Sequence, residues 1–158
     1  MTSTLELFQS IQRSSLGTYI AHQSIWLGAI AQMFHIAGLI SLLSGVLLVS
    51  LRLLGLGLRG QALTQLARSA APLIWGGAAL LLLSGLIIFI PSAALYAPNP
   101  AAWAKAVLLV TALLVHLTLY RKVTSTDTPS PMFARFTAVL SISLWFGVGL
   151  AGRAIGFV

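Results

Sequence analysis

An apolar run from Tyr19 to Leu54 places the strongest constraint on this chain, because it contains no charged residue before Arg52. The hydrocarbon core of a bilayer is about 30 Å thick, and a helix needs about 20 apolar residues to cross it. The run exceeds that length and carries one ionisable group deep in its interior, His35. An ionisable group inside a membrane span is costly, so it marks a candidate functional site. The run therefore predicts a spanning helix with a functional histidine.

The composition extends this membrane character to the whole chain. Of its 158 residues, 58% are hydrophobic and 7% are charged, whereas soluble domains carry roughly 25% charged residues. A water-soluble fold of this length cannot bury so much apolar surface. We therefore expect residues 1–158 to form a single transmembrane domain.

Four apolar segments have about the length of a membrane span, and none shows the alternation of a strand. Glycine, proline and polar residues typical of loops separate them. The expected spans are residues 24–51, 71–90, 101–120 and 136–157. Pro72 then falls in the first turn of the second span, where proline is tolerated. Residues 3–17 predict a short amphipathic helix on the membrane surface, with a frayed terminus as the alternative. The fold class is thus all-α, an integral membrane four-helix up-down bundle.

The basic residues indicate the orientation of the bundle. The net charge is +7, yet the basic side chains stand at the ends of apolar runs, where they meet lipid headgroups. We therefore expect a lipid partner and no nucleic acid. Two loops on one side hold Arg52, Arg59, Arg68, Arg121, Lys122 and Arg135. The positive-inside rule places that side in the cytoplasm and both termini in the periplasm.

Several kinds of chemistry are excluded by the residues that are missing. The chain has no cysteine, so it has neither disulfides nor thiolate metal sites. Its two carboxylates, Glu6 and Asp127, lie outside the expected spans, which counts against a carboxylate proton relay. There is no serine–histidine–acid set, phosphate-binding glycine loop or HExxH motif. We do not expect an autonomous enzyme.

One helical face of the first span carries Gly28, Gln32, His35 and Gly38. Glycines on this face leave room for a flat, bulky group beside the backbone, as a haem or quinone pocket between helices requires. The alternative is a neutral His35 that hydrogen-bonds a carbonyl or Gln32 across a tight helix contact. Both interpretations remain open at this point.

Cationic groups gather near the outer boundary expected for the bundle. Lys105 and Arg153 would hold an anion there: haem propionates, a phospholipid headgroup or a carboxylate of a partner. Lys105 alternatively extends to the headgroups. His22 lies near the same boundary, and together with His35 it would form a metal site, for example for copper.

His116 shares a face with Lys105, eleven residues earlier on the third span. It stands close to Arg121, so an interfacial histidine is the alternative to a cofactor ligand. A bis-histidine haem with His35 is disfavoured, because the two residues differ in depth by roughly 15 Å at 1.5 Å of rise per residue.

Several motifs resemble those of an uncharacterised family of small four-helix bacterial inner-membrane proteins, domain of unknown function 6644. The matching pieces are SSLG (14–17), FHIAGL (34–39), SLRLLGL (50–56), SG (84–85), NPAAWAKAVLL (99–109) and SLWFGVGLAGRAIGF (143–157). The resemblance implies an inner-membrane location, and the histidine, lysine and arginine of the family pattern correspond to His35, Lys105 and Arg153. Ser50 departs from it, since the family pattern has aspartate there. Looser likenesses exist to small cytochrome b subunits and copper-resistance membrane proteins.

Our leading hypothesis is a membrane-embedded accessory or electron-transfer subunit that binds haem b in the outer half of the bundle. His35 would be the axial ligand, and the other cofactor-binding candidates are Gln32, Gly38, Lys105, His116 and Arg153. The first alternative is a cofactor-free structural subunit of a larger membrane complex. The second is a copper-handling or other metal-handling protein that uses His22 and His35. The expected protein partner is another membrane or periplasmic subunit, or a second copy of the chain.

Overall fold

The computed structural model describes residues 2–23 and 25–158, and every regular element within them is helical. Ser24, the expected start of the first span, lies outside the described residues. The long helices are α3 (Ile25–Leu54), α4 (Leu63–Phe89), α6 (Pro100–Val115) and α8 (Pro131–Ala154). The shorter elements are α1 (Thr2–Gln12), α2 (Ser15–Ala21), the 3-10 turn η1 (Ile90–Ser92), α5 (Ala93–Tyr96), the π-helical turn η2 (His116–Tyr120) and α7 (Arg121–Thr124).

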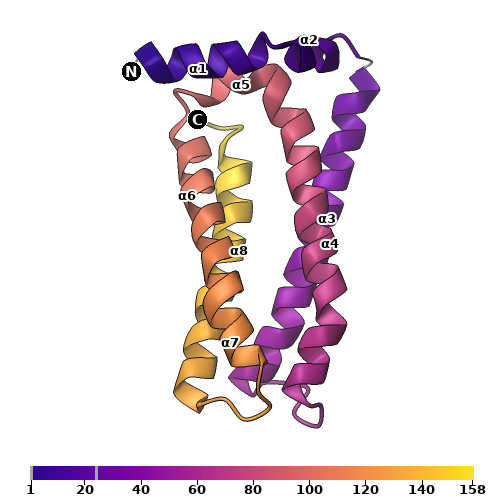
Figure 1. The fold of residues 1–158 in the computed structure, drawn as a ribbon, viewed down its shortest axis with the longest axis vertical. Helices are drawn as coiled ribbons and strands as arrows, with labels where there is room; N and C mark the ends of the chain where they lie inside the picture. Colours follow the sequence, from indigo (N-terminus) through magenta and orange to yellow (C-terminus); the bar gives the residue numbers. More distant parts are fainter. Residues whose placement is uncertain (1, 24) are drawn as a thin grey trace.

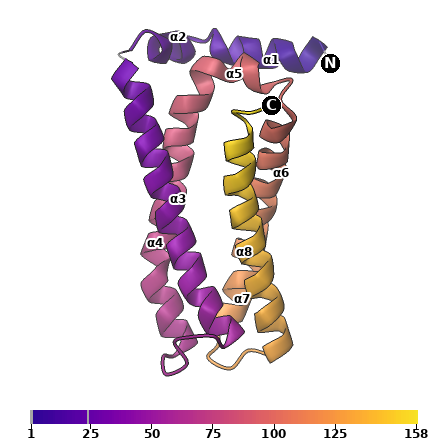
Figure 2. The same ribbon diagram turned by 180° about the vertical axis from the view of Figure 1, so that it is seen from behind.

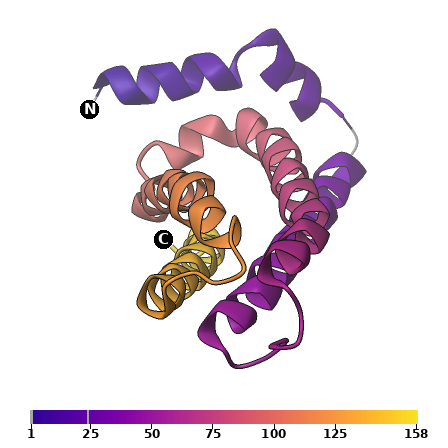
Figure 3. The ribbon, with the colours of Figure 1, turned by 60° about the horizontal axis from the view of Figure 1, so that its bottom comes forward.

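The long helices form two antiparallel hairpins, α3 with α4 and α6 with α8, which are joined by contacts between α3 and α8 (Figures 1 and 2). Both termini lie at one end of the bundle, and α1 and α2 cross that end (Figure 1). We call this the terminal end. The opposite end carries the 55–62 and 125–130 loops and is called the loop end; Figure 3 shows the two hairpins as separate pairs.

Four helical stretches of the described chain are long and apolar enough to cross a bilayer: Trp26–Leu54, Leu63–Tyr96, Pro100–Thr124 and Pro131–Ala154. The expected all-α membrane bundle is therefore confirmed. The third stretch is continuous because α6 runs through η2 into α7. The protein is a multi-pass membrane protein.

The second span begins earlier than expected, since α4 starts at Leu63. Pro72 consequently lies inside this helix, and not in its first turn. A proline there removes one helical hydrogen bond, to the carbonyl of Arg68. Leu63 and Leu66 are buried in the first turns of α4, and this burial offsets the loss.

Helices α3 and α4 touch through their backbones. A Cβ atom added at Gly77 would lie 2.6 Å from the amide nitrogen of Leu42 and 2.7 Å from the carbonyl oxygen of Gly38. Gly45 is similarly close to Ile74, with 2.6 Å between an added Cβ and the Cγ1 atom. Glycine at these positions permits the close approach that holds helices together in a membrane.

The surface helices tie the hairpins together at the terminal end. The ring of Phe8 on α1 lies 5.7 Å from that of Phe89 and 5.9 Å from that of Trp103, between centroids. The expected single helix over 3–17 is divided in two, because Ser14 caps α2 through a bond from the Gly17 amide of 3.1 Å. The amphipathic N-terminal segment thus packs against both α4 and α6.

Alanine at Gly77 is expected to force α3 and α4 apart and lower the free energy of unfolding by roughly 1–3 kcal/mol, the usual cost of overpacking. Gly76→Ala is the matched control, since nothing lies within 4 Å of a Cβ added there. SDS-induced unfolding in mild detergent, followed by circular dichroism, measures the difference. Equal losses in the two variants would contradict the backbone contact.

At the loop end, Asp127 bridges the hairpins. One of its carboxylate oxygens accepts hydrogen bonds from the Thr64 amide at 2.9 Å and the Thr64 hydroxyl at 2.8 Å. The residue that precedes α4, Ala62, has no side-chain acceptor of its own, so Asp127 takes that capping role from another part of the chain. These hydrogen bonds lower the pKa of Asp127 below its ordinary value.

A carboxylate with a lowered pKa stabilises the fold above its ordinary pKa, and the contribution is lost as the pH falls through the lowered value. Asp127→Ala should therefore be less stable than the wild type at neutral pH, and the difference should shrink below about pH 4. Unfolding curves measured across this range test the expectation, with Glu6→Ala as the control. A difference that does not depend on pH would show that the charge of Asp127 is irrelevant.

Candidate functional site

His35 on α3 is fixed by a hydrogen bond to the neighbouring helix. Its Nδ1 atom lies 3.0 Å from the hydroxyl oxygen of Ser84 on α4. The Ser84 hydroxyl donates its single proton to the carbonyl of Leu80, at 2.5 Å. Ser84 must therefore accept from His35, which places the imidazole proton on Nδ1 and a lone pair on Nε2. A histidine that binds metal through Nε2 has this arrangement, in which the other nitrogen donates to a fixed acceptor.

The His35 ring lies against α4 at Gly85. A Cβ atom added to Gly85 would be 3.2 Å from Cε1 of the ring and 3.6 Å from Nδ1. Ser84 therefore sets the tautomer, and Gly85 leaves the space that the ring occupies. The His35 side chain is partly buried.

Lys105 on α6 reaches across to α8 in its own hairpin. Its ammonium packs across Gly152, where an added Cβ would lie 3.2 Å from Nζ. Lys105 thus lies across α8 and is partly buried. Lys105 and His35 lie at a similar level of the bundle, because a Cβ added at Gly149, one turn before Gly152, would lie 3.6 Å from Leu39, one turn after His35.

The other residues expected beside His35 lie elsewhere. Gly38 is buried in the α3–α4 contact, where an added Cβ would lie 2.9 Å from the carbonyl oxygen of Gly77. It serves helix packing and has no room for a cofactor. Gln32 is exposed. Arg153 is exposed and stacks on Phe157, with 4.8 Å between its guanidinium carbon and the ring centroid.

His22 is at the end of α2 and does not share a helix with His35. Its Nδ1 lies 2.7 Å from the carbonyl oxygen of Thr18, within its own helix. Residues 2–23 and 25–158 contain no group of three or more histidine or carboxylate side chains placed to hold a metal ion. A metal site at His22 and His35 stays a prediction.

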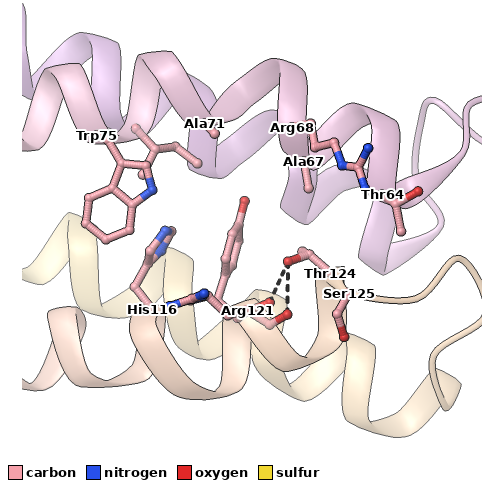
Figure 4. A pocket seen from close by; sticks show the side chains of 11 residues that line it. Thr64, Ala67, Arg68, Ala71, Trp75, His116, Arg121, Thr124 and Ser125 are labelled. Carbon is pink, nitrogen blue, oxygen red and sulfur yellow. Dashed lines mark hydrogen bonds between the residues drawn. The ribbon is translucent and has the colours of Figure 1, made fainter.

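His116 occupies a different environment, near the loop end. It is 3% exposed and stacks on Tyr120, with ring centroids 4.1 Å apart and planes inclined by 20°. The ring of Trp75 on α4 meets His116 edge-on at 5.4 Å. These rings line one end of a pocket of about 630 Å³ between α4 and the η2–α7 segment (Figure 4).

The two histidines contact α4 at Ser84 and Trp75, nine residues apart. At 1.5 Å of rise per residue these points are separated by about 13 Å along the helix. Their separation agrees with the difference in depth expected from the sequence. His35 and His116 therefore belong to two separate sites.

Sequence reasoning missed the partners that define both sites. Ser84 and Gly85 stood out as a dipeptide but were not connected to His35. Tyr120 follows His116 by four residues, which is the spacing of neighbours on a helix surface. This spacing alone would have predicted their contact. The π-helical turn and the approach of Trp75 depend on tertiary packing.

The fold and these two polar sites define a multi-pass helical membrane protein with ionisable side chains between its helices. Residues 7–158 match the model of DUF6644, described as a family of unknown function. The chain belongs to this family, as the motifs predicted. Neither a curated protein nor a solved structure shows significant similarity to the chain. The looser likenesses to cytochrome b subunits and copper-resistance proteins stay predictions.

The hydrogen bond to Ser84 predicts that neutral His35 carries its proton on Nδ1. Nitrogen-15 NMR of histidine-labelled protein in detergent measures this directly, and the His35→Ala spectrum assigns the signal. In Ser84→Ala the acceptor is lost and the two tautomers should mix. A wild-type His35 protonated on Nε2 would overturn the assignment.

Proposed function

We propose that this protein is a membrane-embedded electron-transfer or accessory subunit that binds haem b at His35, in the half of the bundle near its terminal end. The observation that carries the proposal is the hydrogen bond of 3.0 Å between His35 Nδ1 and the Ser84 hydroxyl. It fixes the ring and leaves the Nε2 lone pair for a ligand. Haem iron accepts histidine nitrogen as its commonest protein ligand.

The surroundings of His35 suit this group. Lys105 supplies a positive charge at a similar level of the bundle, where it packs on Gly152, and an ammonium group pairs with carboxylates such as the propionates of haem. Gly85 keeps the α4 surface flat beside the imidazole. His35 would hold the haem through Nε2, and the bound haem would supply the redox-active iron. A copper site that includes His22 has less support, because His22 bonds the carbonyl of its own helix.

The location proposed for this subunit is the bacterial inner membrane, with the loop end in the cytoplasm and both termini in the periplasm. Six of the nine basic residues flank or occupy the two loops of the loop end. The positive-inside rule uses this asymmetry to assign the cytoplasmic side of the membrane. Electrons would then be exchanged on the periplasmic side, with a membrane or periplasmic partner.

The test is an absorption spectrum of the protein purified in detergent from haem-replete cells, recorded oxidised and after dithionite. We expect a Soret band and, on reduction, sharp α and β bands. His35→Ala should abolish these bands, while His22→Ala, which alters an exposed histidine at the same end, should keep them. Ser84→Ala should retain haem with roughly 10- to 100-fold weaker affinity, the usual effect of losing the partner of a metal ligand.

Two results would overturn the proposal. One is a featureless visible spectrum from folded wild-type protein that also fails to bind added hemin. The other is a haem spectrum that His35→Ala leaves unchanged. Circular dichroism of each variant verifies that the helices are intact.

A further inference from the structure

The pocket near the loop end has the features of a ligand site that is independent of His35. Its volume of about 630 Å³ is within the range of small-molecule sites, roughly 300–1,000 Å³. Figure 4 shows it between α4, which contributes Trp75 and Arg68, and the helix that carries His116 and Arg121. Both walls are membrane-spanning helices, so the pocket lies at membrane depth at its His116 end.

Two buried polar atoms on the pocket wall have no partner among the described residues. They are the hydroxyl of Tyr120 and Nδ1 of His116. The two side chains are 4% and 3% exposed. A buried polar group without a hydrogen bond costs about 1–3 kcal/mol. A ligand that accepts or donates hydrogen bonds at this position would remove that cost.

The backbone is irregular at the same place. Residues His116–Tyr120 form a π-helical turn, in which the Arg121 amide bonds the carbonyl of His116, five residues earlier. Single π turns inside α-helices occur frequently at functional sites. Here the turn begins and ends at the two pocket residues with unpartnered polar atoms, His116 and Tyr120. Irregular backbone and unpaired side chains thus coincide at the pocket.

Polar and aromatic groups both line the pocket. The exposed Arg68 and Arg121 line it together with Thr124 and Ser125. Trp75, His116 and Tyr120 form the aromatic end, and Trp75 is presented edge-on to the imidazole. The unpaired polar atoms of Tyr120 and His116 lie at this aromatic end.

We propose that this pocket binds an isoprenoid quinone: a flat, uncharged ring with two carbonyl oxygens and an apolar tail. The ring would pack against the aromatic residues, and its carbonyl oxygens would accept from Tyr120 and His116. A phospholipid headgroup is the other occupant with access from the membrane. Its phosphate would pair with the exposed Arg68 and Arg121, and reaching the buried Tyr120 and His116 would take its charge out of water at a high cost. The quinone therefore satisfies the observations that the lipid leaves unexplained.

The experiment titrates decylubiquinone into the full-length protein in phosphatidylcholine nanodiscs and follows quenching of tryptophan fluorescence. Trp75 lines the pocket, and a membrane-bound tryptophan ester corrects for quenching by quinone dissolved in the bilayer. We expect saturable quenching, and Tyr120→Phe should raise Kd about tenfold, since it removes one hydrogen bond. Tyr19→Phe, at an exposed tyrosine of the terminal end, should leave Kd unchanged.

A further variant distinguishes the two occupants. The double substitution Arg68→Gln, Arg121→Gln should change the Kd for quinone less than twofold, because the ligand is uncharged. The proposal is overturned if quenching never saturates, or if Tyr120→Phe binds as tightly as the wild type. It is also overturned if phosphatidylglycerol displaces the quinone and the arginine variant removes that competition, which would identify a lipid site.

Stability separates a ligand-binding role of Tyr120 from a structural one. Because its hydroxyl has no partner in the described chain, ligand-free Tyr120→Phe should be at least as stable as the wild type. A large loss of stability in this variant would assign the hydroxyl to the fold and overturn the proposal. This result does not depend on haem at His35, so the two proposals fail independently.

Discussion

The backbone contact between α3 and α4 governs the positions of both candidate sites. Gly38 and Gly77 remove the side chains that would hold the two helices apart, and the helices then run antiparallel in close register. In one direction from this contact, His35 comes opposite Ser84 and Gly85. In the other direction, Gly45 comes opposite Ile74, and the adjacent Trp75 faces away toward His116. A slip of one residue between the helices would disrupt both arrangements.

The two sites differ in how their polar atoms are satisfied. The Nδ1 atom of His35 is paired by Ser84, which in turn bonds the backbone, so that side chain is held in one orientation without a ligand. His116 and Tyr120 stack on each other but leave two polar atoms unpaired in a buried position. The first arrangement is characteristic of a prepared metal ligand. In the second arrangement, two buried polar atoms lack hydrogen bonds, and a bound molecule that supplied these bonds would remove the free-energy cost.

The sequence was sufficient for the features that depend on composition and on single helices. Apolar run lengths predicted the number and kind of spans, and the cost of a charge in lipid singled out His35 and Lys105. The sequence was insufficient where the packing of two helices against each other determines the surroundings of a residue. The glycine at 38 looked like room for a cofactor, but it is filled by the backbone of α4. Pro72 looked like a helix start, but burial of Leu63 and Leu66 extends the helix before it. The π turn at His116 and the bridge from Asp127 to Thr64 likewise have no local signature.

The position of Phe8 has a mechanical consequence. Its ring contacts Phe89 in one hairpin and Trp103 in the other, so α1 connects the two hairpins at the terminal end. Gln12 adds a hydrogen bond, since its side-chain oxygen accepts from the Ala94 amide at 2.9 Å. The affinity of an amphipathic surface helix for the bilayer depends on lipid packing and membrane curvature. The spread of the hairpins at this end is therefore tied to the physical state of the surrounding leaflet.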